Sequence, residues 1–202
     1  MKKILALILI VGCIFAFASC GLLGGGKDET PPADVSSIQQ AIDASAPVSA
    51  KITVELNSVL GDLNGEYNVD FNSDGSATVN YSYELFNEFN VDSVELGPKS
   101  TYTGVVTVSA DGQLSEEIGG VAAAEAVSFD IALDEALFET VTVESSVLRG
   151  TVKADNTYDI LGVALDYDVE LVILTGNGRV TSIIINYVAE SGPIEITATY
   201  HY

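Results

Sequence analysis

The feature that most constrains the fold is an alternation of apolar and polar side chains with a period of two residues. In the first such segment, Ile52, Val54 and Leu56 alternate with polar residues. Successive side chains of a β-strand point to opposite faces of a sheet, so this pattern predicts strands with one apolar and one polar face. The same alternation returns in five later segments, which are 67–71, 77–83, 167–173, 183–187 and 194–202.

Residues that tolerate a positive φ angle stand between these segments. The last three segments are joined through 176–178 and through Gly192, which predicts a three-stranded meander at the end of the chain. The predicted turns, in chain order, are 62–65, 73–75, 111–112, 155–156, 176–178 and 191–193.

Helical signals are few. Asp34 is a good helix N-cap, and Ile38, Ala41 and Ile42 fall on one face after it, which predicts a short helix over 35–45. Further helical signals are weaker: single turns are predicted at 85–89 and at 134–137, the second before a strand through 141–143, whereas 116–126 fits either a helix or a loop.

Together these signals predict a β-rich α+β fold, in which a curved antiparallel sheet, a half-barrel, is covered by one or a few short helices. With so few helices available, we expect the sheet to curl on itself or the helices to lie across its concave side. Such a geometry often leaves a cavity. The candidate apolar pocket consists of Ile52, Val54, Leu56, Val69, Phe71, Val79, Tyr81, Ile183, Ile185, Tyr187, Ile196 and Tyr200.

The start of the chain has a different pattern. Lys2 and Lys3 precede an unbroken apolar run over 4–18, which is the layout of an export signal. The alternative, a permanent transmembrane helix, needs about 20 apolar residues. We therefore expect a signal peptide over 1–19, a flexible tether over 20–33 that is rich in glycine and proline, and a single globular domain over 34–202.

The residues Phe17-Ala18-Ser19-Cys20 resemble the lipobox of bacterial lipoproteins, in which a signal peptidase cuts before a cysteine that already carries diacylglycerol. That family usually has Leu where Phe17 stands. The resemblance implies lipid on Cys20 and an exported protein held on the extracytoplasmic side of the cell membrane, or on the outer membrane of a Gram-negative host. Each buried methylene contributes about 0.8 kcal/mol, so two or three acyl chains anchor a protein stably.

The charge balance excludes one class of partner. The chain has 8 Lys and Arg against 29 Asp and Glu, and removal of Lys2 and Lys3 with the leader leaves 6 against 29, a net charge of −23. Nucleic acid is an implausible partner because phosphate contacts need clustered Lys and Arg. Hydrophobic residues make up 48% of the chain, so it is not disordered, and the acids are expected on a solvated outer face.

The order of elements also resembles a known group. An exported lipoprotein with an opening helix, a long antiparallel meander and a final hairpin from 176–183 into 194–200 is similar to the LolA- and LppX-like lipoproteins. These are half-barrels, and members of the group carry lipids or lipoproteins in the apolar hollow. The resemblance covers about 34–202 and implies the same fold and an apolar cargo.

One segment matches the opening of a calcium loop. Asp70, Asn72 and Asp74 place oxygens at alternate positions before Gly75, as in loops that wrap a hard cation. The twelfth position is Tyr81, where such loops require a bidentate Glu. The segment also lies between two predicted strands, so a plain hairpin turn is the preferred interpretation and weak calcium binding the alternative.

Catalytic patterns are sparse. His201 is the only histidine and is next to last, which argues against a nucleophile with a histidine base. Paired carboxylates occur wherever 29 acids are scattered, so no pair points to a glycosidase. No phosphate loop or dinucleotide fingerprint is present. We therefore expect a non-enzyme without a cofactor.

Several tyrosines stand near strand ends, and they either cap the core or line the mouth of an apolar pocket.

Together these features predict a membrane-anchored binding module for apolar cargo, such as lipid or acyl chains, in the cell envelope. The alternative is an acidic interaction lipoprotein with a filled core and no ligand. A hollow large enough for an acyl chain distinguishes the first from the second.

Overall fold

A computed structural model describes residues 34–57, 61–86, 89–90, 95–110, 115, 131–161 and 164–202 of the protein. The predicted signal peptide, Cys20 and the tether lie outside these residues, as do the predicted turn at 111–112 and the ambiguous segment 116–126. In the part of the chain that is described, no helix is long and apolar enough to cross a membrane.

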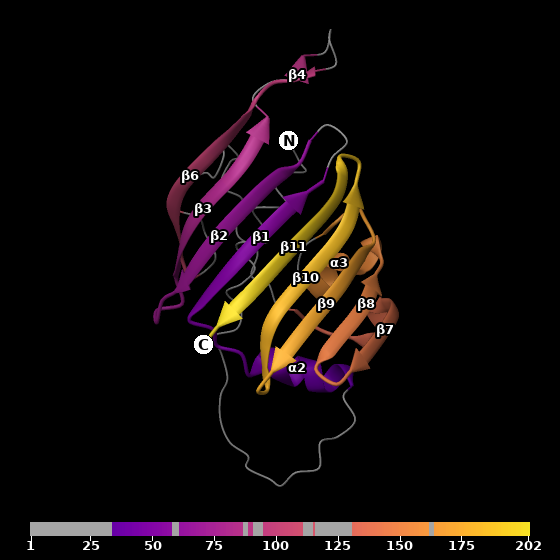
Figure 1. Cartoon of the computed structure of the whole chain (residues 1–202). Helices are drawn as coiled ribbons and strands as arrows, with labels where there is room; N and C mark the ends of the chain where they lie inside the picture. Colours follow the sequence, from indigo (N-terminus) through magenta and orange to yellow (C-terminus); the bar gives the residue numbers. More distant parts are fainter. Residues whose placement is uncertain are drawn as a thin grey trace.

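Nine antiparallel strands form one sheet, in the order β6-β3-β2-β1-β11-β10-β9-β8-β7 (Figure 1). A separate two-stranded ribbon pairs β4 (Phe89–Asn90) with β5 (Glu95–Leu96). The strands of the large sheet are β1 (Ser49–Leu56), β2 (Leu63–Phe71), β3 (Ala77–Phe86), β6 (Lys99–Val108), β7 (Phe138–Glu144), β8 (Val147–Val152), β9 (Val169–Gly176), β10 (Arg179–Ala189) and β11 (Gly192–His201).

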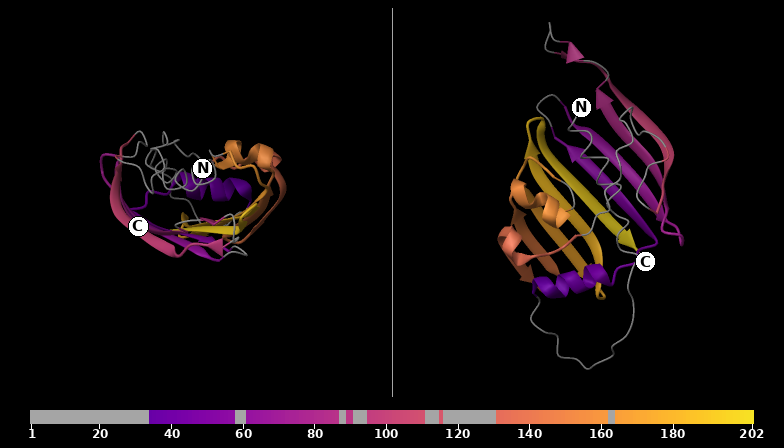
Figure 2. Two further views of the ribbon diagram at one scale, coloured as in Figure 1. Left: turned by 90° about the horizontal axis from the view of Figure 1, so that it is seen from above. Right: turned by 180° about the vertical axis from the view of Figure 1, so that it is seen from behind.

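Two meanders meet at the middle of this sheet. The chain moves outward from β1 to the edge strand β6, and from the opposite edge β7 it returns strand by strand to β11. There β11 pairs with β1 over eight residue pairs, from Ser49 opposite His201 to Leu56 opposite Ile194. The sheet is curved but not closed (Figure 2). The predicted fold class, a curved antiparallel sheet covered by short helices, is confirmed.

The helices lie on the concave side of the sheet (Figure 2). The first, α2 (Val35–Asp43), is capped by Asp34, whose carboxylate accepts the N–H of Ser37 at 2.8 Å. It packs against β8, β9 and β10. A 3-10 turn, Glu135–Leu137, leads into β7, and a second, Ala154–Asn156, leads into α3 (Thr157–Leu161). The predicted opening helix and the turn at 134–137 are confirmed, whereas α3 was not predicted.

The closing hairpins have the turn chemistry that the sequence indicates. Asn177 and Gly178 both have positive φ angles, of 53° and 72°, and they join Gly176 to Arg179 as a two-residue turn whose twist matches the strands. Gly192, the first residue of β11, has a φ of 133°. The three-stranded meander at the end of the chain is confirmed.

Three local predictions are wrong. Leu85 and Phe86 continue β3 and do not form a helical turn, because they pair with Ser100 and Lys99 of β6. The predicted turn at 62–65 is largely strand, since β2 already begins at Leu63. The predicted turn at 155–156 is part of the helical connection that carries the chain from β8 over the sheet to β9.

Candidate functional site: the inner face of the sheet

The inner face is the concave, apolar side of the sheet. Residues directly opposite each other on neighbouring antiparallel strands share a face. Ile52 lies opposite Tyr67 on β2 and opposite Ala198 on β11, and Ala198 in turn lies opposite Ile183 on β10. The same register places all the predicted pocket residues on this face, namely Ile52, Val54, Leu56, Val69, Phe71, Val79, Tyr81, Ile183, Ile185, Tyr187, Ile196 and Tyr200.

These side chains differ in burial. Most of them belong to one cluster of buried hydrophobic residues that runs across the whole sheet. Leu56, Phe71 and Tyr81 are only partly buried. The candidate residues thus share one apolar surface, on which these three are partly accessible and the others are inside the core.

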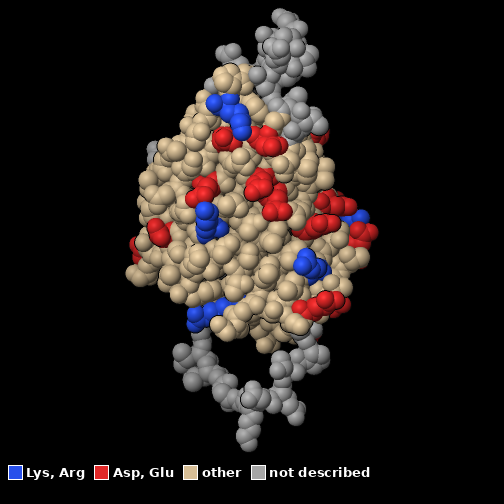
Figure 3. All heavy atoms as spheres, in the orientation of Figure 1, with Lys and Arg blue, Asp and Glu red and all other residues tan. Residues whose placement is uncertain are grey.

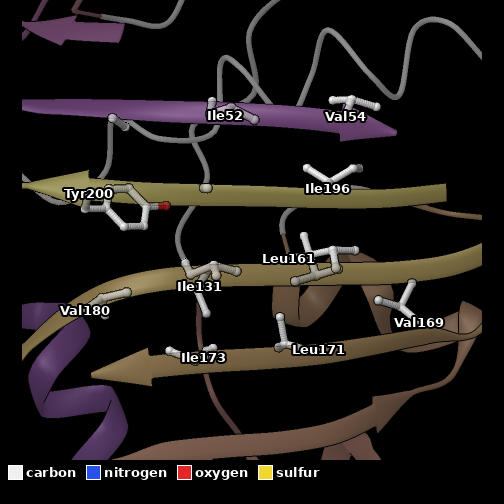
Figure 4. Packing of buried hydrophobic residues seen from close by; sticks show 14 of the residues in the cluster. Ile52, Val54, Ile131, Leu161, Val169, Leu171, Ile173, Val180, Ile196 and Tyr200 are labelled. Carbon is white, nitrogen blue, oxygen red and sulfur yellow. The ribbon is translucent and has the colours of Figure 1, made fainter. Parts of the chain in front are cut away.

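The helices α2 and α3 and the segment 131–133, which we call the crossing segment, fill the half of the inner face over β8–β11. Ile38 and Ile42 of α2 are buried against it, and Ile131 and Leu161 join the same cluster as Leu171 of β9. Figure 4 shows Ile131 and Leu161 lying among labelled side chains of β1, β9, β10 and β11. This half of the face is occupied by the protein itself.

One side chain fastens the crossing segment to α2. The amide oxygen of Gln39 accepts the N–H of Leu133 at 2.8 Å, and its nitrogen donates to the carbonyl of Ile131 at 3.3 Å. The N–H of Ala132 donates to the carbonyl of Ile160 in α3 at 3.3 Å. The segment 131–133 is therefore held between both helices.

A row of tyrosines lies at the other half of the inner face. We use the term tyrosine row for Tyr67, Tyr81, Tyr83 and Tyr102. The rings of Tyr81 and Tyr83 stack at 5.7 Å between centroids, and those of Tyr83 and Tyr102 at 5.4 Å. Tyr67 is 1% exposed and Tyr102 is 42% exposed, so the row passes from the core to solvent as it nears β6.

Glycines make room for these rings. A Cβ atom at Gly104 would lie 2.6 Å from Cζ of Tyr81, and one at Gly65 would lie 3.1 Å from Cε2 of Tyr67. The rings of Tyr81 and Tyr67 therefore lie close to the space that these Cβ atoms would occupy. Burial raises the pKa of the Tyr67 hydroxyl, and burial together with the neighbouring tyrosines raises the pKa of Tyr83. Both hydroxyls stay protonated at neutral pH.

A second aromatic pair stands near the loop that precedes β9. The rings of Tyr167 and Tyr187 stack at 5.8 Å between centroids. Burial, with a smaller effect of Tyr167, raises the pKa of Tyr187 to about 12. Of the two, only Tyr187 belongs to the predicted pocket.

The outer face is polar and acidic. Glu55, Glu195, Asn186 and Glu170 lie opposite one another on successive strands and form a row across β1, β11, β10 and β9. Figure 3 looks onto this face and shows acidic side chains gathered over its middle. Lys51 pairs there with Glu66 at 2.8 Å.

Two open hollows also involve this polar face. One of about 750 Å³ includes Glu170, Asn186 and Glu195 in its lining, and one of about 350 Å³ includes Glu55, Glu66 and Glu84. Both are lined by several carboxylates. Each also includes one predicted pocket residue, Tyr187 in the first hollow and Val54 in the second. The other predicted pocket residues do not line either hollow.

The candidate calcium loop is a tight turn. The carboxylate of Asp74 accepts the N–H and the hydroxyl of Ser76, at 2.9 and 2.6 Å, and Asn72 donates to the same hydroxyl at 3.0 Å. The bonds from the hydroxyl and the N–H of Ser76 lower the pKa of Asp74. Within the described ranges, no group of three His, Cys, Asp or Glu side chains is arranged to hold a metal ion.

Sequence reasoning missed the edge of the tyrosine row and the covering layer. Tyr102 lies in β6, where Gly104 and Val105 interrupt the alternation. Ile131 and Leu161 lie in segments without a regular period. A signal for β6 was present in its β-branched residues, because Thr and Val make up six of its ten positions.

Comparisons with known proteins add little. No protein-family model and no curated protein matches the chain. Among solved structures, the chain is similar to the dehydratase domain from the CurF module of curacin polyketide synthase, at 8% identity over 82% of this chain and 78% of that domain. The TM-score of that match is 0.22, which is too low to support an argument about fold or function.

Proposed function

We propose that this protein is a lipid-anchored, non-enzymatic binding module of the bacterial cell envelope, which shelters an apolar ligand such as a lipid or an acyl chain. In this proposal, residues 1–19 direct export and lipid on Cys20 holds the chain on the extracytoplasmic side of the membrane. The domain over 34–202 then presents the inner face of its sheet to the ligand.

The observation that carries the proposal is the accessible aromatic margin of a continuous apolar face. The inner face over β8–β11 is filled by α2, the 131–133 segment and α3. Toward β3 and β6, Phe71 and Tyr81 are partly exposed and Tyr102 is more exposed still. Aromatic rings with an apolar body and a polar tip suit the boundary between an alkyl chain and water.

Three carboxyl groups with close hydrogen-bond partners are poorly suited to acid catalysis. A catalytic carboxylic acid at neutral pH needs a raised pKa. Hydrogen bonds and nearby lysines instead lower the pKa of Glu66, Glu84 and Asp168. His201 is exposed at the end of β11.

A photoactivatable fatty acid tests the proposed ligand site in cells that express the full chain. After irradiation, we expect labelled peptides from the inner face of β3 and β6. Tyr81→Glu should reduce labelling at least fivefold, because a charge on the apolar margin repels an alkyl chain. Asn80→Glu is the matched control, since it places the same charge on the opposite face of β3 and should leave labelling unchanged. Equal labelling of both variants would contradict the proposal.

Metabolic labelling with an alkyne-tagged palmitate tests the anchor. Cys20→Ser should abolish incorporation and leave the chain as the longer, uncut precursor, because the peptidase of bacterial lipoproteins cuts before a cysteine that already carries diacylglycerol. Cys13→Ser is the control, because Cys13 lies in the predicted leader and leaves with it. Incorporation that persists in Cys20→Ser would contradict the proposed lipid anchor. It would leave the proposed ligand site on the inner face untouched.

A second candidate function rests on the outer face. The row of Glu55, Glu195 and Glu170 favours an interaction module that meets a cationic partner, with the core filled by its own side chains. The fatty acid experiment separates the two, because this alternative expects no labelling on the inner face.

A further inference from the structure

One edge of the sheet is open for strand pairing. Three consecutive residues of β6, Thr101, Tyr102 and Thr103, are exposed, so both faces of the strand meet solvent there. An edge strand presents unpaired N–H and C=O groups that form a template for another strand. In an antiparallel strand, the N–H and C=O groups of alternate residues point to the same side. The N–H and C=O groups of residues 101, 103 and 105 therefore point away from β3, as those of Thr107 do.

Ser115 occupies one end of this edge. Its N–H donates to the carbonyl of Thr107 at 2.8 Å, and its hydroxyl accepts the N–H of Thr107 at 3.0 Å. It thus takes the place that a neighbouring strand would take. Among the residues that the structure describes, this contact leaves the segment 99–105 of the edge open.

The opposite edge strand, β7, has features that protect it from pairing with another chain. β7 has Glu139 and Glu144 near its ends, and its register shifts between Phe138 and Thr140. Charges and bulges of this kind discourage pairing with another chain. β6 has no charged residue over 100–108 and consists mainly of Thr, Val and Tyr, which suit strands. The two edges in Figure 1 therefore differ in their capacity to pair.

We propose that β6 pairs antiparallel with β6 of a second copy of this chain, about a two-fold axis at Tyr102. The open segment 99–105 has its midpoint at residue 102, and a two-fold pairing needs a register symmetric about its centre. Thr101 then lies opposite Thr103 of the second copy, and Tyr102 lies opposite Tyr102. A register centred further along β6 brings the second strand onto Ser115.

The side chains agree with this register. Tyr102 stacks on Tyr83 on the inner face and is 42% exposed, so a second Tyr102 continues the tyrosine row across the axis. On the outer face, Lys99 lies opposite Val105 of the second copy. In the single chain, Val105 is 54% exposed. No like charges of β6 face each other. The net charge of −21 acts at longer range, where physiological salt screens it beyond about 8 Å.

Disulfide capture in cells expressing the full chain tests the dimer and its register. Tyr102→Cys places two thiols at a non-hydrogen-bonded pair, where Cα atoms lie about 4.5 Å apart, within the range of a disulfide. After mild oxidation, we expect most of this variant to migrate as a covalent dimer. The parental chain sets the background, since its cysteines are Cys13 and Cys20. Val188→Cys is the matched control at an exposed site away from the edge.

A second capture leaves the tyrosine row intact. A tagged chain with Thr101→Cys is co-expressed with an untagged chain with Thr103→Cys. We expect a mixed disulfide dimer at several times the yield of the disulfide dimer that Thr142→Cys, on β7, forms. Capture of Tyr102→Cys at no more than the Val188→Cys level, with no mixed dimer, overturns the proposal. If instead the dimer of two Thr103→Cys chains forms in the highest yield, the register centred on Tyr102 is wrong.

Discussion

The hydroxyl of Ser45 accepts the N–H of Val180 at 2.9 Å, across 135 residues of sequence. Ser45 follows α2 and is 2% exposed, and its own proton goes to the carbonyl of Ala41 at 2.7 Å. The register of β10 on β9 shifts between Val180 and Ser182. The hydroxyl of Tyr202 also donates to the Val180 carbonyl. The end of α2, the irregular start of β10 and the end of the described chain are thus joined at one point.

Ser45→Ala should destabilise the domain by about 1–3 kcal/mol, because it leaves the buried N–H of Val180 without a partner. Urea unfolding followed by circular dichroism measures the change. Ser73→Ala, in the exposed turn between β2 and β3, is the control and should stay within about 0.5 kcal/mol of the parent. Equal midpoints for the two variants would mean that the Ser45 bond contributes nothing.

Gln39→Ala should release the 131–133 segment from α2. The Leu133 N–H and the Ile131 carbonyl both lose their bond to this side chain, so hydrogen exchange at Leu133 should become at least tenfold faster. Gln40→Ala removes the same side chain from the next, exposed position of the helix and should leave this exchange rate unchanged. Unaltered protection in Gln39→Ala would show that packing alone holds the segment.

Gly150→Ala should cost more stability than Gly104→Ala. A Cβ atom at Gly150 would lie 2.6 Å from Cε1 of Phe138 and 3.1 Å from the backbone carbonyl of Thr140, and neither the buried ring nor the backbone has room to move. Overpacking of this kind costs about 1–3 kcal/mol.

At Gly104, the three atoms nearest to an added Cβ all belong to the Tyr81 side chain, which is partly exposed and therefore freer to move. Thermal unfolding of both variants gives the comparison, and the opposite ranking would mean that the Tyr81 ring is held more firmly than the Phe138 ring.

The stability of the domain should fall as the pH rises from 10 toward 12. Burial raises the pKa of Tyr187 from its ordinary value of 10.0 to about 12. In this window the unfolded chain loses a proton that the folded chain keeps, so alkali favours unfolding by at most about 1.4 kcal/mol per pH unit for this group. Below pH 10 both states hold the proton, and this contribution is constant.

Urea midpoints at pH 9, 10 and 11 measure the alkaline slope. Tyr187→Phe should make the slope shallower, whereas Tyr158→Phe, at a tyrosine that is 59% exposed in α3, should not. Identical slopes for all three proteins would refute the assignment to Tyr187.

Much of the fold could be predicted because its signals are local. Asp34 begins α2 through bonds to its own next residues, and Asn177-Gly178 makes a turn because both positions accept a positive φ. The period of two placed all twelve candidate residues on one face. The strand β8 was missed because Gly150 stands at an inward position between Leu148 and Val152 and interrupts their apolar series. The helix α3 was missed because its five residues are too few for a helical period.

In the strands with a regular alternation, the sequence by itself determined which side chains face inward, because that depends only on the alternation of neighbouring residues. Tertiary structure decided that β1 lies beside β11, that α2, α3 and 131–133 together cover half of the inner face, and that Tyr102 stands at an open edge. These outcomes depend on which distant segments pair and which pairings they exclude. A pattern with a period of two is the same for every strand, so it does not specify a neighbour.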